Sequence, residues 1–288
     1  MLTWSTCARL LERRGAGGRY GTDNRYFVVR FHVESRNGLR RLRTLAAGAG
    51  KRHCYAGLLT GRYAGRNGWP KSFDEPQLFL HRLSAALRWP DLRGQCRPEK
   101  PWLNGLPRLI FLNDMGDTFT ESLPLDWLGP VWQSIADSCH LWLVLTKRPQ
   151  RMREFLRQYG CPANVWPGVS VTSSANLARL DELAKVDSPM RWLSAEPLLS
   201  ALEVSRLDPS VLRWVVVGGE SGRGARVSEL QWFRDIRNHC SIFGIPFFMK
   251  QLGSVHGAHK GTDSIPPDLL VREVPGPNSA AVFAQETQ

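Results

Sequence analysis

The sequence predicts an α/β protein built as a full or partial TIM-like barrel of parallel strands. After residue 107, short apolar runs alternate with polar loops and with segments of helical periodicity for about 140 residues. Repeated strand, loop and helix units form right-handed βαβ crossovers, which produce a parallel sheet. The number of units favours a barrel over an open doubly wound sheet, with strands starting near residues 108, 141, 165, 190, 214 and 245.

Amphipathic segments separate these strands and are expected to form helices that cover the sheet. Their apolar residues recur three or four positions apart, and Pro149 suits the first turn of one helix. Ser228 and Gln231 have the spacing of a capping box before the last helix. A further helix is expected before the first of the six strands. The predicted helical ranges are 76–87, 125–139, 149–159, 177–183 and 230–240.

Composition indicates a globular protein without contact with a membrane. The chain has 288 residues, of which 42% are hydrophobic and 22% are charged. No apolar run approaches the roughly 20 residues that a membrane span needs. The N-terminus lacks the apolar core of a secretory signal, and the six cysteines do not resemble a small disulfide framework. We therefore expect a cytoplasmic protein.

The N-terminal segment differs from the rest of the chain because it is rich in arginine and glycine. Residues 8–53 hold 12 Lys and Arg against 3 Asp and Glu, so nine of the twelve excess positive charges lie there. This range is either a solvated, poorly ordered insertion or a basic arm for nucleic acid. We divide the chain into this N-terminal segment (1–53), a βα-barrel domain (54–253) and an extended or disordered tail (254–288).

Polar residues recur where the predicted strands end, and the carboxyl ends of barrel strands form the active-site face. Lys147, Glu196 and Glu220 are the candidate catalytic residues. The two glutamates could act as general bases or bind a substrate amine. Both glutamates could instead form a structural ion pair with Lys147 or Lys250. Lys147 and Arg148 could belong to a solvated loop or form an anion clamp. The candidate cofactor-binding residues are Asn113, Asp117, Arg148, Gly218, Gly219, Ser221, Lys250 and Gln251.

A glycine-rich loop follows the most apolar of these strands. Residues 214–217 predict a buried strand, and residues 218–224 then read Gly-Gly-Glu-Ser-Gly-Arg-Gly. This loop has the spacing of neither a nucleotide P-loop nor a dinucleotide-binding fingerprint. The chain also lacks common zinc and calcium motifs, which argues against ordinary metal-dependent hydrolysis. We expect a loop that faces a cofactor.

Short motifs occur in a fixed order along the chain: Trp4 and Cys7, His53–Ala56 (HCYA), Phe111–Phe119 (FLNDMGDTF), Leu145–Pro149 (LTKRP), Gly168–Val171 (GVSV), Leu193–Leu199 (LSAEPLL), Val217–Gly222 (VGGESG) and Phe247–Gly253 (FFMKQLG). Together they resemble a phage and bacterial family of three-cysteine, radical-SAM-like proteins of unassigned biochemical function. The resemblance covers residues 54 to about 253, and residues 268–273 also fit.

The resemblance implies a barrel that holds a 4Fe–4S cluster on three cysteines and leaves one iron free for S-adenosylmethionine. Cys54 matches the last of these cysteines, and Cys7 is the candidate for the first. Lys51 stands where the family has the middle cysteine. This departure leaves open whether the cluster, and with it the activity, is kept in this chain.

Two other functions remain open from the sequence. One is a non-catalytic, nucleic-acid-associated protein that uses the basic residues 8–53. The other is a metal-independent barrel hydrolase or lyase with Glu196 and Glu220 as acid and base.

Overall fold

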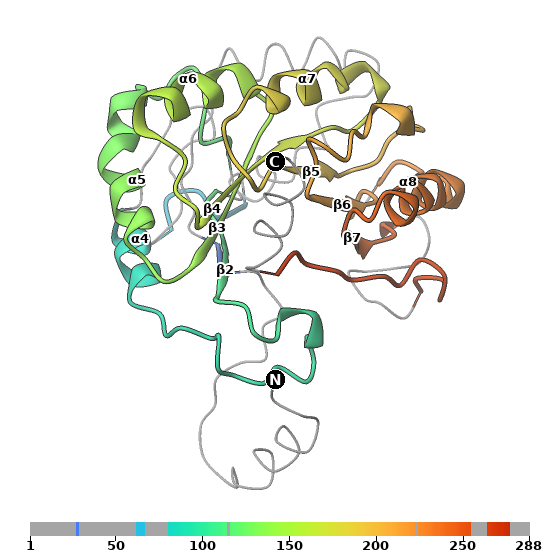
Figure 1. Cartoon of the computed structure of the whole chain (residues 1–288), viewed down its shortest axis with the longest axis horizontal. Helices are drawn as coiled ribbons and strands as arrows, with labels where there is room; N and C mark the ends of the chain where they lie inside the picture. The colour runs from blue at the N-terminus through green and yellow to red at the C-terminus, as the bar shows by residue number, and fades with distance from the viewer. Residues whose placement is uncertain are drawn as a thin grey trace, which may run out of the picture.

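The protein folds around a parallel sheet that curls into a half-barrel (Figure 1). A computed structural model of the chain describes residues 27–28, 62–66, 80–113, 116–222, 224–254 and 264–276. Each strand in this part pairs in parallel with its neighbour in the sequence. The strands are β1 (Phe27–Val28), β2 (Leu109–Phe111), β3 (Leu141–Thr146), β4 (Val165–Ser170), β5 (Trp192–Ala195), β6 (Trp214–Gly218) and β7 (Phe247–Gln251). The predicted parallel βα architecture is confirmed in its partial, half-barrel form.

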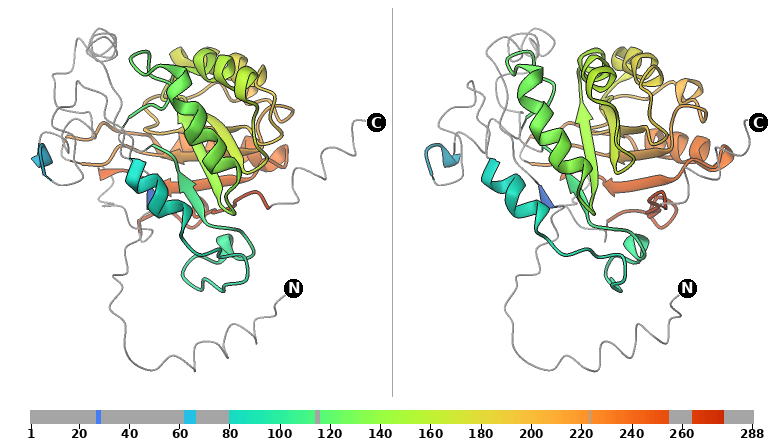
Figure 2. Two further views of the ribbon diagram at one scale, coloured as in Figure 1. Left: turned by 90° about the vertical axis from the view of Figure 1, so that its left-hand side faces the viewer. Right: turned by 60° about the vertical axis from the view of Figure 1, so that its left-hand side comes forward.

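The helices follow one another around the outside of the curled sheet (Figures 1 and 2). They are α4 (Leu80–Leu87), α5 (Gly129–Ala136), α6 (Pro149–Tyr159), α7 (Ala178–Ala184) and α8 (Leu230–Ile242), with short 3₁₀ turns η1 (Pro101–Leu103), η2 (Leu125–Leu128), η3 (Ser174–Asn176) and η4 (Val204–Arg206). Within the described residues, none of the helices combines the length and the apolar character that crossing a bilayer requires.

The predicted capping box at the start of α8 is wrong. Glu229 is the N-cap residue, and no side chain caps the helix there. The hydroxyl of Ser228 instead donates a hydrogen bond of 2.5 Å to the carbonyl of Leu198, because Ser228 is buried against the loop that follows β5. A tertiary contact has therefore replaced the local one.

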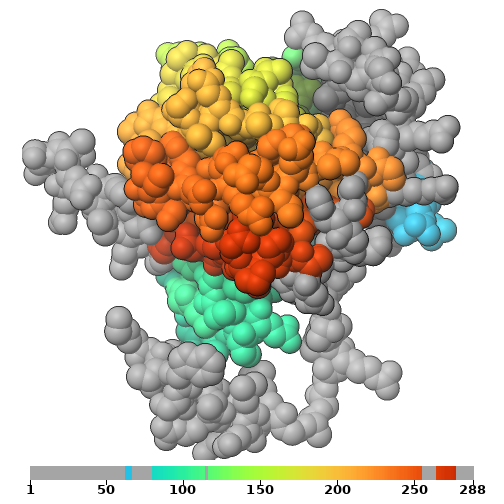
Figure 3. Space-filling view, turned by 90° about the vertical axis from the view of Figure 1, so that its right-hand side faces the viewer, coloured from blue at the N-terminus to red at the C-terminus, as the bar shows by residue number. Residues whose placement is uncertain are grey.

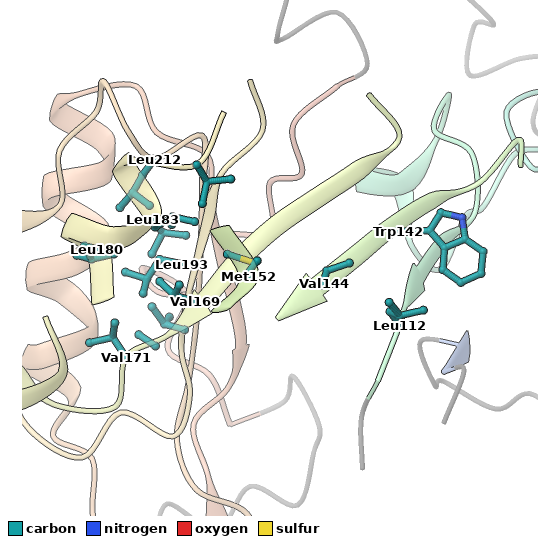
Figure 4. Packing of buried hydrophobic residues seen from close by; sticks show 14 of the residues in the cluster. Leu112, Trp142, Val144, Met152, Val169, Val171, Leu180, Leu183, Leu193 and Leu212 are labelled. Atoms are coloured by element: carbon teal, nitrogen blue, oxygen red, sulfur yellow. The ribbon is translucent and has the colours of Figure 1, made fainter. Parts of the chain in front are cut away.

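The larger of two apolar cores lies between the sheet and the helices. Alternate strand residues such as Val144, Val169 and Leu193 point toward the helices, where Met152 and Leu183 meet them (Figure 4). These five side chains are fully buried. Burial of one such side chain contributes about 1.5–3 kcal/mol, so this core fixes which face of each strand is turned outward.

The second core fills the concave face of the sheet with aromatic rings. Trp192 and Trp214 lie with their ring centroids 5.4 Å apart, and Trp214 meets the edge of Phe248 at 6.1 Å. The indole N–H of Trp192 donates to the carbonyl of Trp166 at 2.8 Å, which lays the ring across β4. A Cβ on Gly168 would lie 2.4 Å from that ring, so a glycine is needed under Trp192.

The C-terminal segment covers the outer edge of β7. The N–H of Met249 donates to the carbonyl of Val271 at 2.8 Å, and the N–H of Glu273 donates to the carbonyl of Phe247 at 2.9 Å. Phe248 and Arg272 form an antiparallel bridge at the same edge. In Figure 3 the segment appears as a red strip beside the orange surface of α8. Because this segment occupies backbone groups of β7, β7 is the last parallel strand of the sheet among the residues that the structure describes.

We predict that Gly168→Ala lowers the free energy of unfolding by about 1–3 kcal/mol, because the new methyl group overlaps the Trp192 ring. Urea unfolding followed by tryptophan fluorescence measures the change. Gly94→Ala is the matched control, since nothing lies within 4 Å of a Cβ at that position, and should change stability by no more than about 0.5 kcal/mol. Equal stability of the two variants would contradict the packing described above.

Candidate functional site

The parallel, in-order strands bring their carboxyl ends to one face of the half-barrel, which we call the carboxyl-end face. The predicted site residues in the described part of the chain either end a strand or follow one, and so lie at this face: Asn113 after β2, Asp117 in the same loop, Lys147 and Arg148 after β3, Glu196 after β5, Gly218 at the end of β6 with Gly219 to Ser221 after it, and Lys250 and Gln251 at the end of β7. The predicted cluster ligands Cys7 and Cys54, and also Lys51, lie outside the described residues.

Asp117 joins the loop after β2 to the end of β3. Its buried Oδ1 accepts hydrogen bonds from the N–H of Phe119 at 3.0 Å and from the hydroxyl of Thr146 at 2.7 Å. Its Oδ2 accepts from the N–H of Lys147 at 2.9 Å and from Nη1 of Arg148 at 3.0 Å. Four donors engage both oxygens, so we interpret Asp117 as the residue that positions Lys147 and Arg148.

Glu196 and Lys250 form an ion pair between the ends of β5 and β7. The ammonium Nζ of Lys250 lies 3.1 Å from Oε1 and 3.3 Å from Oε2 of Glu196, and Oε2 also accepts a bond from the Ser194 hydroxyl at 3.2 Å. The Lys250 side chain is 44% exposed and that of Glu196 18% exposed. An ion pair this open to solvent contributes at most about 1 kcal/mol to stability. Both charges therefore remain available to a ligand at little cost.

The first glycines of the loop after β6 make room for this pair. A Cβ on Gly218 would lie 2.6 Å from Oε1 of Glu196. A Cβ on Gly219 would lie 1.9 Å from the carbonyl oxygen of Leu252, because the two backbones are joined by a bond from the Gly219 N–H to Gln251. The Gln251 amide returns a bond to the Gly219 carbonyl at 2.9 Å. The glycines thus bring β6, β7 and the Glu196 carboxylate together.

Glu220 is engaged within its own loop. Its Oε2 accepts from the backbone N–H of Arg226 at 2.8 Å and from Nε at 2.9 Å, and its Oε1 accepts from Nη2 at 2.7 Å. This carboxylate raises the pKa of Arg226 through hydrogen bonding. Ser221 is exposed beside it. An ion pair with a lysine, expected for the glutamates, is therefore present at Glu196 with Lys250, whereas Glu220 pairs with Arg226.

Asn113 and Thr118 carry buried polar atoms that have no hydrogen-bond partner among the described residues. Both amide atoms of Asn113 and the hydroxyl of Thr118 are inaccessible to water, and the two residues are 4% and 2% exposed. A buried donor or acceptor left unpaired costs about 1–3 kcal/mol. The cofactor contact expected for Asn113 remains a prediction, and the unpaired amide is the observation that bears on it.

Arg179, on α7, is a residue of this face that the sequence did not reveal. Its Nη1 donates to the carbonyl of Ser170, at the end of β4, at 2.5 Å. Burial lowers the pKa of this guanidinium, the charge of Asp117 opposes the shift, and the charge of Arg148 adds to it. No strand-end pattern marks position 179, because the side chain reaches the face from a helix.

The described cysteines do not form a cluster site. Cys139, Cys161 and Cys240 are free thiols, and Cys96 is disulfide-bonded. Burial raises the pKa of Cys161 to about 11 and that of Cys240 to about 12, which disfavours the thiolate that binds iron. In the part of the chain that the structure describes, no three His, Cys, Asp or Glu side chains gather in a way that could hold a metal ion.

A cavity of about 480 Å³ lies at the opposite face, where the strands begin. It is lined by Cys139, His140 and Asn164 among others. The Asn164 amide already donates to three carbonyls, and Nε2 of His140 is paired with the carbonyl of Ala86 at 3.1 Å. Burial lowers the pKa of His140. Because these polar groups hold the backbone in place, we assign the functional site to the carboxyl-end face instead.

Comparison with models of protein families assigns the chain to a family of unknown function. The family described as "Protein of unknown function (DUF5131)" matches residues 44–274, which is most of the chain and includes all strands from β2 to β7. The chain therefore belongs to this family. Comparisons with curated proteins and with solved structures find no match.

We predict that Asp117→Asn lowers the free energy of unfolding by about 2–4 kcal/mol, because an amide cannot accept all four hydrogen bonds and leaves Arg148 without its counter-charge. Thermal and urea unfolding measure the loss. Asp126→Asn, at an exposed position in η2, is the control and should change stability by about 0.5 kcal/mol or less. A loss no larger than that of the control would show that Asp117 does not organise the face.

Proposed function

We propose that the protein is a radical-SAM-type barrel whose carboxyl-end face binds the amino-acid end of S-adenosylmethionine. The observation that carries the proposal is the Glu196–Lys250 pair, which presents a carboxylate and an ammonium about 3 Å apart on the same face. An α-amino acid carries both charges as well. Its ammonium would pair with Glu196 and its carboxylate with Lys250, so that one weak ion pair is replaced by two.

The surrounding residues support a bound cofactor on chemical grounds. Gly218 lets the Glu196 carboxylate lie against the end of β6, because a Cβ at that position would clash with Oε1. The unpaired amide of Asn113 offers one donor and one acceptor, which suits the edge of a planar base such as adenine. In this proposal Glu196 and Lys250 hold the amino-acid end, and Asn113 contacts the base.

The iron–sulfur part of the proposal rests on the resemblance, through Cys54 and Cys7. When bound, a 4Fe–4S cluster would supply the electron that reductive cleavage of S-adenosylmethionine requires. The described residues provide no ligand set for it, so its ligands would come from outside them. Lys51 stands in place of the middle cysteine. If the cluster is not formed for this reason, the proposal is restricted to a protein that binds S-adenosylmethionine without cluster chemistry.

A nucleic-acid-associated protein remains the second candidate. The observation that favours it is the charge of residues 8–53, which hold nine of the twelve excess positive charges. These residues are almost entirely outside the described part of the chain.

We predict that Glu196→Gln and Lys250→Gln each weaken S-adenosylmethionine binding about tenfold or more, because each removes one charge-assisted contact. Isothermal titration calorimetry on the full chain, purified without oxygen, measures the affinity. Glu99→Gln and Lys185→Gln are charge-matched controls at exposed positions outside the strands and the loops that directly follow them, and they should leave the affinity unchanged. Adenosine, which lacks the amino-acid end, should bind all five proteins alike.

Two results would contradict this proposal. One is an unchanged affinity of the Glu196 and Lys250 variants, and the other is an equal loss in the controls. Iron and sulfide analysis after anaerobic reconstitution tests the cluster separately, since S-adenosylmethionine can bind whether or not iron is retained.

A further inference from the structure

Strand β7 contains a bulge at Lys250, the lysine of the ion pair at the carboxyl-end face. The register between β6 and β7 runs evenly up to Val217, which faces Met249. The next residue of β6, Gly218, faces Gln251, so Lys250 is an extra residue that no residue of β6 faces. A bulge of this kind bends the strand and redirects the groups around the extra residue.

The bulge removes the carbonyl of Lys250 from the hydrogen-bond ladder with β6. The N–H of Val215 donates to the carbonyl of Pro246 at 3.0 Å. In an evenly spaced parallel ladder the same contact recurs at every second residue, which would bring the N–H of Gly219 to the carbonyl of Lys250. Gly219 donates instead to the carbonyl of Gln251 at 2.9 Å. The carbonyl of Lys250 therefore takes its donor from elsewhere.

That donor is Arg272, on the C-terminal segment that covers the edge of β7. Its Nη2 donates to the carbonyl of Lys250 at 3.3 Å, and its Nε donates to the carbonyl of Met249 at 3.3 Å. Each bond is long, but one planar guanidinium makes both, so two successive peptide groups at the bulge are held by a single rigid side-chain group. The antiparallel bridge of Arg272 with Phe248 keeps its backbone beside the same strand.

Two aromatic rings hold the guanidinium of Arg272 in place. Its Cζ lies 5.0 Å from the centroid of the Trp102 ring, in η1, and 5.4 Å from the centroid of the Phe248 ring, in β7. The two rings meet edge to face at 6.1 Å. A guanidinium is attracted to the face of an aromatic ring. The orientation of Arg272 thus does not depend on its two long hydrogen bonds alone.

We infer that Arg272 is a positioning residue for the S-adenosylmethionine contact at Lys250, an inference that rests on the function proposed above. The guanidinium holds the bulge, and the bulge sets the backbone from which Nζ of Lys250 reaches Glu196 at 3.1 Å. A lysine ammonium ends a flexible chain of four carbons, so a displaced backbone would move it away from the carboxylate of the ligand. In this role Arg272 acts through Lys250 and does not itself contact the ligand.

A second arginine fastens the same C-terminal segment at a different place. Nε of Arg234, on α8, lies 2.9 Å from Oδ2 of Asp268, and both side chains are partly exposed. This ion pair joins the segment to α8 rather than to β7. Arg234 therefore provides a matched control, because its removal loosens the segment without removing the donors at the bulge.

The test combines crystal structures with calorimetric titration of the full chain. Arg272→Met removes both donors and keeps a long side chain between the rings. We expect it to move Nζ of Lys250 more than about 4 Å from the Glu196 carboxylate, which is the limit for an ion pair. We also expect it to weaken S-adenosylmethionine binding about fivefold or more and adenosine binding by less than about twofold.

Two further variants separate positioning from a general loss of structure. Arg272→Lys keeps the charge against the rings and can donate to one carbonyl, so it should recover part of the affinity. Arg234→Gln removes the ion pair with Asp268 and should change neither the distance between Lys250 and Glu196 nor the affinity.

The two measurements also separate this inference from the function on which it rests. If the unmodified chain does not bind S-adenosylmethionine, the proposed function fails, and the distance between Lys250 and Glu196 alone decides whether Arg272 positions the lysine. An unchanged distance in Arg272→Met, an unchanged affinity in a chain that binds, an equal loss in Arg234→Gln or an equal loss of adenosine binding would overturn the inference. If Arg272→Met does not fold, Arg272→Lys decides, since its loss of affinity must exceed that of Arg234→Gln.

Discussion

The half-barrel depends on how its concave face is filled. Trp192 lies across β4 because position 168 is a glycine, and it packs on Trp214 from the next strand. The tryptophan-rich cluster on the concave face and the larger core beneath the helices together fix the orientation of strands β2 to β7. A change of one residue in register would exchange these two faces, so the packing also determines which side chains stand at the strand ends.

Charged groups at the carboxyl-end face fall into two kinds as a consequence. Asp117 and Glu220 are engaged by three or more donors each, and they hold loops in place. Glu196 and Lys250 are bound mainly to each other and remain partly exposed. The first kind gives the face its shape, and the second kind gives it charges that a ligand can use. Sequence position alone does not separate them, since Lys250 lies at the end of a strand and the other three follow one.

The strands and helices could be predicted because their signals are local. The apolar run 214–217 predicts a buried strand, and these residues lie in β6. The helices likewise lie where the apolar residues recur at helical spacing. Contacts between distant elements could not be predicted in this way. The donors of Asp117 lie up to 31 residues away in the sequence. Ser228, predicted to cap a helix, instead bonds the distant carbonyl of Leu198. Arg179 reaches the strand ends from a helix. The cluster ligands Cys7 and Cys54 remain predictions.

The central claim is that ligands bind where the strands end and not at the cavity where they begin. A crystal structure of the full chain grown with S-adenosylmethionine tests it most directly. We predict density for the amino-acid end of the ligand between Glu196 and Lys250, with Gly218 beside it. Density instead in the cavity near Cys139 and Asn164, with the Glu196–Lys250 pair undisturbed, would contradict the account.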